Sequence, residues 1–304
     1  MKIQKDIFID ASNLILPDKV LKLFLILYKK YPNIRINNPL LYNALRKNII
    51  VKWPELFKFT KEVRRKLETN NRFVVIRRFP FLQYSSYIRD FLALSFALCI
   101  GRPTPTDVHD EKIIWNITPR KVEYAPTISE NSALAGLHTD SQYRKNPEKY
   151  VMLFAVRRAR KGGLTTILDG KRAIYTLRKK SEGRKCVKIL SSNLFPFRVP
   201  TAYTKQRSEN VPEVIFAPII AKKPLVRFRF DTLSNGFECC PKMRKPEIIW
   251  AINYFNRYVE KHPEKLIFGL NKGEILITNN HEILHGRTAF NDKKRLLLRI
   301  RIAS

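Results

Sequence analysis

The sequence has few acidic residues, few glycines and no biased tract. Its 304 residues include 26 Asp and Glu against 58 Lys and Arg, so the formal net charge is +32 at pH 7. Ten glycines and an apolar content of 44% exclude a fibrous or disordered chain and allow a sizeable core. The charge predicts a polyanionic partner, namely nucleic acid, an acidic membrane surface or an acidic glycan. A merely solvated basic surface is the alternative.

Cysteine is also scarce, and the chain has no long hydrophobic run. The four cysteines form no C-x-x-C pair and no disulfide spacing, which predicts a reducing compartment and hence a cytoplasmic protein. The N-terminus lacks the apolar segment of a secretion signal. Residues 20–28 are apolar, but Lys22 interrupts them and they are too few to span a bilayer. They are expected to form a core helix, with a helix lying on a membrane surface as the alternative.

The expected elements change type along the chain. Residues 1–110 are predicted to be mainly helical. From 111 to 304, short runs rich in β-branched residues predict strands, with one inserted helix near 246–261. This pattern favours a mostly β fold with flanking helices around a jelly-roll core, the cupin-like double-stranded β-helix. No linker divides the chain, so residues 1–304 are expected to form a single domain. The predicted strands of this second part include 113–117, 150–154, 164–168, 214–216, 225–228, 266–268, 274–278 and 295–302.

Residues 281–285, His-Glu-Ile-Leu-His, match H-E-x-x-H, the helix signature of zinc proteases. That chemistry needs a helix, because only a helix places residues i and i+4 on one face beside the metal. The flanks predict otherwise, since residues 274–278 have the composition of a strand, Asn279-Asn280 is a turn signal and Gly286 follows at once. The match is therefore interpreted as a coincidence, and His281 as a surface or supporting histidine.

A different metal site is indicated around residue 138. The chain has only five histidines, and Asp140 lies two positions after His138 along the sequence. Residues i and i+2 of an extended segment point to the same face, so this imidazole and this carboxylate can lie side by side. One histidine from a distant strand would complete the 2-His-1-carboxylate facial triad, which holds Fe(II) and leaves three positions open. H-x-D alone is a weak signal.

The order of further motifs strengthens this interpretation. The motifs are His138-Thr139-Asp140, Gly162-Gly163-Leu164-Thr165, His285-Gly286-Arg287-Thr288-Ala289-Phe290, and finally Arg295 and Arg299. Over roughly residues 70–302 the chain resembles the Fe(II)/2-oxoglutarate-dependent oxygenases of the taurine dioxygenase and clavaminate synthase-like superfamily. The resemblance implies a hydroxylating dioxygenase that uses Fe(II), 2-oxoglutarate and dioxygen. It also implies that His138, Asp140 and His285 are the metal-binding, catalytic residues. Leu164 departs from the pattern, because many relatives have a polar residue there.

The terminal strand suggests how the co-substrate is held. Arg295, Arg299 and Arg301 share one face by alternation. If this face points inward, the arginines require an anion. The alternative is that the face is solvated at the edge of the sheet. By resemblance, Arg295 and Thr165 would hold the distal carboxylate of 2-oxoglutarate. Arg299 would approach the iron-bound carboxylate or the substrate.

The substrate is expected to be anionic. Cations are dense in residues 151–185, and Arg227, Arg229 and Tyr143 are expected near the substrate mouth. Within the superfamily, the hydroxylases of the Kdo sugar of lipopolysaccharide fit this charge. Such an enzyme would meet a glycolipid, a lipid A precursor, at the cytoplasmic face of the inner membrane. Amino-acid or other small-molecule hydroxylation is one alternative. Nucleic-acid oxygenation or demethylation is another, although no dedicated nucleic-acid module is found. The oligomeric state stays open.

Overall fold

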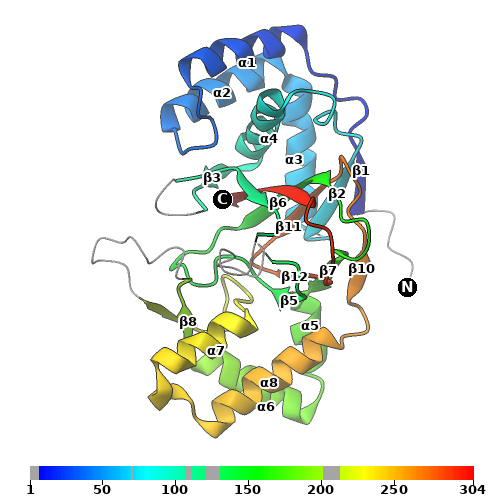
Figure 1. Cartoon of the computed structure of the whole chain (residues 1–304). Helices are drawn as coiled ribbons and strands as arrows, with labels where there is room; N and C mark the ends of the chain where they lie inside the picture. The colour runs from blue at the N-terminus through cyan, green and yellow to red at the C-terminus, as the bar shows by residue number, and fades with distance from the viewer. Residues whose placement is uncertain (1–6, 70, 107–110, 121–130, 201–212) are drawn as a thin grey trace.

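The computed structural model describes residues 7–69, 71–106, 111–120, 131–200 and 213–304. Two β-sheets lie against each other in the middle of the molecule, and helices cover their outer sides (Figure 1). Apolar side chains from both sheets fill the space between them, for example Val75 and Leu276 from one sheet with Ile167 and Ile283 from the other. This arrangement confirms the predicted jelly-roll class with flanking helices.

The larger sheet has seven strands, and all of its pairs are antiparallel except β1 with β2. Its centre is formed by β6 and β13, which contribute residues to both faces. The hydrogen-bonded order is β1 (Phe8–Asp10), β2 (Phe73–Arg77), β11 (Ile275–Asn279), β6 (Tyr150–Arg157), β13 (Leu296–Ala303) and β3 (Arg102–Thr104), and β4 (Trp115–Ile117) also pairs with β13.

The smaller sheet is antiparallel and carries the residues of interest for function. Its order is β10 (Leu266–Phe268), β7 (Thr165–Asp169), β12 (Ile283–Arg287) and β5 (Ala135–His138). Two further strands, β8 (Phe195–Arg198) and β9 (Val214–Ala217), pair with each other apart from both sheets.

The N-terminal helices cover the outer face of the larger sheet. In α1 the residues Val20, Leu23, Phe24 and Leu27 are buried at helical spacing, which confirms the expected core helix. Asn38 caps α2 by accepting a hydrogen bond from the backbone N–H of Leu41. None of the helices in the described part of the chain is long and apolar enough to cross a membrane. The helices are α1 (Asp18–Lys30), α2 (Pro39–Lys52), α3 (Pro54–Glu68) and α4 (Ser86–Ile100).

The second half contains more helix than the sequence predicted. The expected helix is present as α8 (Pro246–Glu260), but the prediction of only one inserted helix was wrong. The additional helices are α5 (Gly170–Leu177), α6 (Ser181–Ser192), α7 (Phe230–Cys239) and the 3₁₀ turn Pro241–Met243. Helix α6 buries only Gly183, Cys186, Val187 and Leu190, so its apolar stripe is hidden among charged residues.

Residues 225–228 were also predicted wrongly, because they do not form a strand. They make one isolated bridge, between Val226 and Ile220. The backbone N–H of Phe228 donates instead to the hydroxyl of Thr139 at 3.1 Å. The carbonyl of Phe228 accepts from the backbone N–H of Thr139 at 2.8 Å. This segment therefore supports the loop that follows β5, next to the predicted metal ligands.

Candidate metal centre

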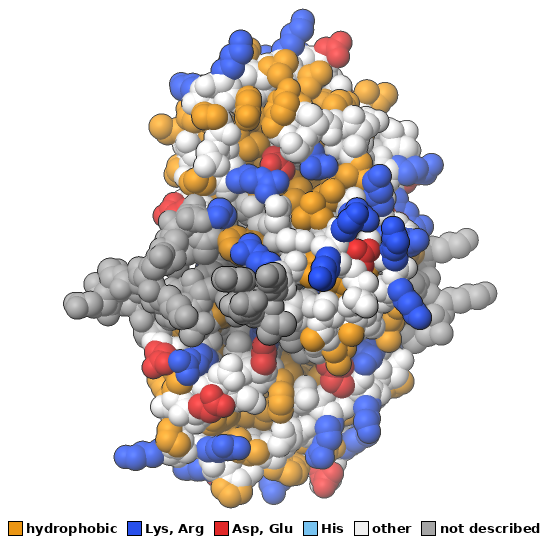
Figure 2. Space-filling view, viewed as in Figure 1, with side chains coloured by type: hydrophobic (Ala, Val, Ile, Leu, Met, Phe, Trp, Pro, Cys, Tyr) orange, Lys and Arg blue, Asp and Glu red, His pale blue; other side chains and the backbone are white. Residues whose placement is uncertain are grey.

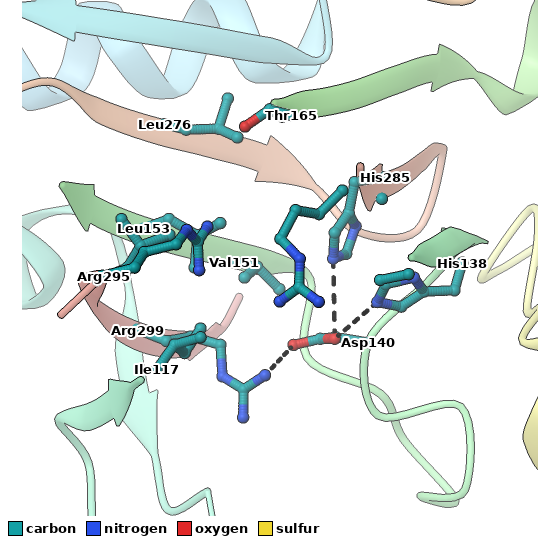
Figure 3. A pocket seen from close by; sticks show the side chains of 14 residues that line it. Ile117, His138, Asp140, Val151, Leu153, Thr165, Leu276, His285, Arg295 and Arg299 are labelled. Carbon is teal, nitrogen blue, oxygen red and sulfur yellow. Dashed lines mark hydrogen bonds and ion pairs between the residues drawn. The ribbon is translucent and has the colours of Figure 1, made fainter. Parts of the chain in front are cut away.

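The structure brings the three predicted metal ligands together. His138 ends β5, Asp140 lies two residues beyond it, and His285 lies in the middle of β12. The Nε2 atom of each histidine is 3.7 Å from Asp140 Oδ1. One ligand atom from each of the three residues lies within 4.8 Å of the others, and the side chains converge in Figure 3. Two imidazoles and a carboxylate at this spacing fit the ligand set of a mononuclear ferrous centre.

Strand pairing sets the positions of the two histidines. His285 is the register partner of His138 on β5 and of Ile167 on β7, so β12 is held on both sides. The Nδ1–H of His138 donates to the carbonyl of Gly136 at 2.7 Å, which directs the Nε2 lone pair toward Asp140 and the centre. Burial, together with the nearby His285, lowers the pKa of His138. The imidazole is therefore neutral at pH 7, as metal binding requires.

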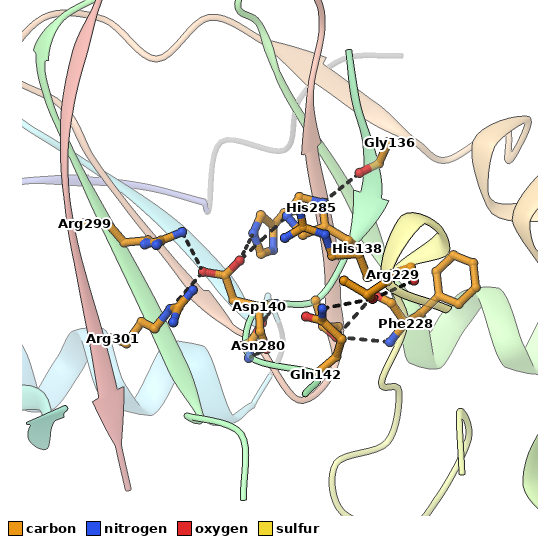
Figure 4. Close-up of polar contacts among 12 residues, drawn as sticks. Gly136, His138, Asp140, Gln142, Phe228, Arg229, Asn280, His285, Arg299 and Arg301 are labelled. Carbon is orange, nitrogen blue, oxygen red and sulfur yellow. Dashed lines mark hydrogen bonds and ion pairs between the residues drawn. The ribbon is translucent and has the colours of Figure 1, made fainter. Parts of the chain in front are cut away.

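Asp140 uses its two carboxylate oxygens differently (Figure 4). Oδ1 faces the histidines, whereas Oδ2 accepts from Arg299 Nη1 and Arg301 Nε, both at 3.2 Å. Burial alone would raise the pKa of Asp140, but Arg299, Arg301 and the histidine contacts hold it well below its usual range. The carboxylate is thus ionised before any metal binds.

Asn280 holds the ligand loop and was missed from the sequence, where it was interpreted only as part of a turn. Its Oδ1 accepts the backbone N–H of Asp140 at 2.7 Å. Its Nδ2 donates to the carbonyls of Asp140 at 3.0 Å and Glu148 at 2.9 Å. The buried Asn280 amide thus forms hydrogen bonds with both backbone N–H and carbonyl groups of the loop, and these bonds keep the Asp140 carboxylate in place. In the sequence, only its position five residues before His285 could have indicated this supporting role.

A cavity of about 70 Å³ adjoins the ligands, and three buried arginines, Arg287, Arg295 and Arg299, line it. Arg295 Nη1 has no hydrogen-bond partner in the described part of the chain. Burial lowers the pKa of Arg295 to about 10, and the neighbouring Arg287 adds to that effect. Burial also lowers the pKa of Arg287 to about 10. Phe290 lies against both guanidinium groups, at 5.0 and 4.7 Å from its ring centre. Arg287 Nε also lacks a partner among the described residues, so two buried cations lie side by side and each has an unused donor. Such a pair requires an anion between them.

The residues around this anion position fit the distal carboxylate of 2-oxoglutarate. Thr165 lines the same cavity and is the register partner of Arg287 across β7 and β12. Arg299 also lines it, nearer to Asp140. The structure therefore brings together Thr165, Arg295 and Arg299 as predicted, and it adds Arg287 and Phe290. Both belong to the H-G-R-x-x-F motif, so the sequence analysis singled out these residues but did not predict that they line the anion position.

The three predicted substrate residues lie in different surroundings. Arg229 is close enough to His138 and Asp140 to influence their charge, and it forms an ion pair with Asp231 at 2.8 Å. The Tyr143 hydroxyl lies 3.4 Å from Arg301 Nη1. Arg227 donates instead to three backbone carbonyls, those of Gln142, Arg144 and Lys145, and so it organises the loop after Asp140. A direct contact with substrate stays a prediction for all three.

The zinc-protease alternative does not fit the geometry. Residues 281–285 span a turn and the start of β12 rather than a helix. The Nε2 atom of His281 lies 2.9 Å from the carbonyl of Pro147. Glu282 forms an ion pair with Arg72 at 2.5 Å, and Arg72 also reaches Asp169 at 2.8 Å. Both side chains thus support neighbouring loops, and His281 is absent from the group of residues that could hold a metal.

Comparison with known proteins gives the same fold and identifies the family. Asparagine oxygenase in complex with Fe(II), 2S,3S-3-hydroxyasparagine and succinate has a TM-score of 0.68 at 16% identity, covering 98% of this chain and 93% of that one. Non-heme iron oxygenase OrfP in complex with Fe and alpha-ketoglutaric acid has a TM-score of 0.67 at 18% identity, covering 98% and 93%. The family model described as taurine catabolism dioxygenase TauD, TfdA family matches residues 43–301. This chain belongs to the TauD/TfdA family and is an Fe(II)- and 2-oxoglutarate-dependent dioxygenase.

Proposed function

We propose that this dioxygenase hydroxylates a free amino acid, or a similarly small substrate that carries both charges. The observation that carries the proposal is the Arg229–Asp231 pair beside the metal ligands. The guanidinium of Arg229 is largely buried, whereas the side chain of Asp231 is 46% exposed. A substrate carboxylate can bind the cation while an ammonium group binds the exposed carboxylate. A polyanionic substrate would be repelled by Asp231.

The protein residues would divide the work as follows. His138, Asp140 and His285 would hold the iron, and Arg295, Arg287 and Thr165 would hold the distal carboxylate of 2-oxoglutarate. When bound, iron and 2-oxoglutarate supply the oxidising chemistry that replaces hydrogen by hydroxyl on an unactivated C–H bond. Arg299 and Arg301 keep Asp140 ionised and oriented.

The wall of the cavity would contribute in a second way. Its apolar side chains, including Val151, Leu153 and Leu276, keep water from the reacting carbon.

Two solved relatives support an amino-acid substrate. One was crystallised with 2S,3S-3-hydroxyasparagine and the other with (3S)-hydroxy-L-Arg, each a hydroxylated amino acid. At 16% identity these likenesses indicate the fold and not the substrate. They nevertheless agree with the charge pair at Arg229 and Asp231.

Hydroxylation of Kdo on a lipid A precursor is the second candidate, and the net charge of +32 favours it. Kdo also carries a carboxylate, which could bind a cation near the centre. It has no ammonium group for Asp231. The nucleic-acid alternative is supported only by charge. Turnover therefore has to separate these classes, because a chain this basic binds many anions.

The test is 2-oxoglutarate consumption and product mass against three panels: the twenty amino acids, Kdo-containing lipid, and methylated oligonucleotides. We expect at least one amino acid to stimulate consumption and to gain one oxygen. Replacing Asp231 with Asn should raise the KM for that amino acid at least about tenfold, because it removes a charged hydrogen-bond partner. The matched control is Glu213→Gln, since Glu213 is another exposed carboxylate paired with an arginine. Stimulation by Kdo lipid or oligonucleotide alone would reject the proposal.

A further inference from the structure

Two arginines approach the same carboxylate oxygen of Asp140, but they lie in different surroundings. Arg299 and Arg301 both donate to Oδ2 at 3.2 Å, and Figure 4 shows them reaching it from one strand, β13. Arg299 lines the cavity at the metal ligands, whereas Arg301 is not among the described residues that line it. A ligand in the cavity can therefore meet Arg299, while Arg301 holds Asp140 from outside the cavity.

Neither arginine belongs to the solvated charge of the surface. Figure 2 shows lysines and arginines spread over the displayed face, with fewer acidic side chains among them. Arg299 and Arg301 are instead only 5% and 3% exposed. Burying a guanidinium is costly unless an anion compensates it. Two buried cations on the single charge of Asp140 therefore imply that at least one of them has a further anionic partner.

For Arg301 that partner is part of the protein. Arg301 is close enough to a second buried carboxylate, Glu148, to influence its charge: burial alone would raise the pKa of Glu148, but Arg301 and Arg144 hold it below its usual value. Glu148 is fixed in turn, because its Oε1 accepts from Arg144 and from the Thr104 hydroxyl at 3.0 Å. Arg301 is thus compensated by groups that belong to the fold and stay in place.

For Arg299 the further anion is expected from the co-substrate. The distal carboxylate of 2-oxoglutarate fits between Arg287 and Arg295 in the same cavity. The carboxylate beside the keto group then lies toward the metal ligands. Among the described residues that line the cavity, Arg299 is the cation that contacts one of these ligands, Asp140. An anion arriving there competes with Asp140 for the Arg299 guanidinium.

We propose that Arg301 is the positioning residue that holds Asp140 at every stage, whereas Arg299 exchanges Asp140 for the co-substrate. Without 2-oxoglutarate, both arginines donate to Oδ2 of Asp140. Once 2-oxoglutarate enters, Arg299 turns to its carboxylate, and Arg301 alone keeps Oδ1 of Asp140 facing the two histidines. The second arginine is needed because a buried carboxylate that loses its only cation is left uncompensated.

The test is the Fe(II) affinity of the full chain, measured by anaerobic calorimetry without 2-oxoglutarate and with saturating 2-oxoglutarate. In Arg301→Gln, the affinity without 2-oxoglutarate should change less than about threefold, because Arg299 still holds Asp140. The affinity with 2-oxoglutarate should fall at least about tenfold, because Arg299 is then engaged elsewhere. A merely structural role of Arg301 would lower both affinities by the same factor. Equal losses under the two conditions, or no loss in either, would overturn the proposal.

Two further variants serve as controls for this comparison. Arg301→Lys keeps a cation behind Asp140 and should bring the affinity with 2-oxoglutarate back to within about threefold of the parent protein. Arg35→Gln is the matched control, since Arg35 pairs with the buried Asp90 and lies outside the cavity. It should change neither Fe(II) affinity by more than about twofold. A loss in Arg35→Gln as large as in Arg301→Gln would contradict a specific role of Arg301.

Arg299→Gln tests the same division of roles without altering Arg301, and so it decides the question even if the Arg301 variants fold poorly. Its Fe(II) affinity without 2-oxoglutarate should stay within about threefold of the parent protein, because Arg301 still holds Asp140. Its affinity for 2-oxoglutarate should fall at least about tenfold, because a charged hydrogen bond is lost. The thermal midpoint of the metal-free chain shows which variants are folded. A tenfold loss of Fe(II) affinity in folded Arg299→Gln would show that Arg301 cannot hold Asp140 alone.

Discussion

At the level of single residues, Asp140 links the metal position to the basic character of the chain. One of its oxygens faces two histidines and the other accepts from two arginines. The arginines keep the carboxylate ionised despite burial, since they offset the desolvation that would otherwise raise its pKa. The ligand is therefore prepared for a divalent cation, and part of the large positive charge has a defined local use.

The two histidines of the H-E-x-x-H match should behave differently. Replacing His285 with Ala should abolish iron binding and 2-oxoglutarate consumption, because it removes one of three ligands. Replacing His281 with Ala should leave iron content within about twofold, because that ring contacts the carbonyl of Pro147. Iron per protein after anaerobic loading measures both. Equal loss of metal in the two variants would show that the ligand assignment is wrong.

Arg295 is expected to act on the co-substrate rather than on the metal. Arg295→Gln should weaken 2-oxoglutarate binding by about two to four decades, because one partner of a buried charge pair is worth about 3–5 kcal/mol. Iron affinity should stay nearly the same. Titration of the metal-to-ligand absorption of the anaerobic complex measures the first quantity. Arg158→Gln is the control, since Arg158 donates to Asn271 at 3.0 Å and lies outside the cavity. A change of less than about threefold would mean that Arg295 has another role.

At the level of elements, His262 joins the end of α8 to α5. Its Nδ1 accepts the backbone N–H of Glu264 at 3.2 Å, and its Nε2 lies 3.2 Å from the Thr176 hydroxyl. Because Nδ1 accepts, the ring is neutral in the folded protein. Burial, aided by nearby Arg172 and Lys180, lowers the pKa of His262 from its ordinary value of 6.5. Protonation would break the contact with Glu264.

This pairing predicts how stability depends on pH. The unfolded chain takes up the proton near pH 6.5, whereas the folded ring does so only at lower pH. As pH falls through that window, the unfolded state binds more protons and the free energy of unfolding decreases, by at most about 1.4 kcal/mol per pH unit for this group. Urea unfolding of the metal-free protein at pH 7.5, 6.5 and 5.5 should show the loss. His262→Asn keeps an acceptor without the titration and should reduce the slope. An unchanged slope would exclude His262 as a contributor.

Helices and strands with a clear pattern of apolar residues could be predicted from the sequence, and those without such a pattern could not. The strands 150–154 and 274–278 were predicted because they are continuous and buried, as β6 and β11 are. Helix α6 was missed because four buried residues among lysines and arginines give a weak stripe. The H-x-D…H constellation was predictable because the order of the motifs resembles that of the Fe(II)/2-oxoglutarate-dependent oxygenases. Asn280 was not, since its value lies in contacts with Asp140 and Glu148 that only the fold creates.

At the level of the whole molecule, the charge of +32 remains larger than the described sites require. The dense basic tract at 151–185 does not form one surface, because β6 and β7 contribute buried residues while α5 and α6 expose theirs. The predicted association with an anionic membrane surface would therefore be diffuse. Each Lys or Arg near such a surface contributes about 1 kcal/mol, and the attraction fades within a Debye length.

This diffuse charge leads to a prediction about membranes. The protein should sediment with phosphatidylglycerol vesicles at low ionic strength and should be released as salt approaches about 0.5 M. Vesicles of neutral phosphatidylcholine are the control and should not retain it. Retention at high salt would instead indicate insertion of apolar side chains such as Ile26, which is 65% exposed on α1.

The pairing of His138 with His285 across β5 and β12 has a consequence for quality control of folding. Because side chains alternate along a strand, a register slip of one residue would turn one imidazole to the opposite face. A slipped chain could not assemble the three ligands. Iron occupancy would then measure correct folding. In a purified sample, the fraction of chains that bind metal would equal the fraction that folded in the correct register.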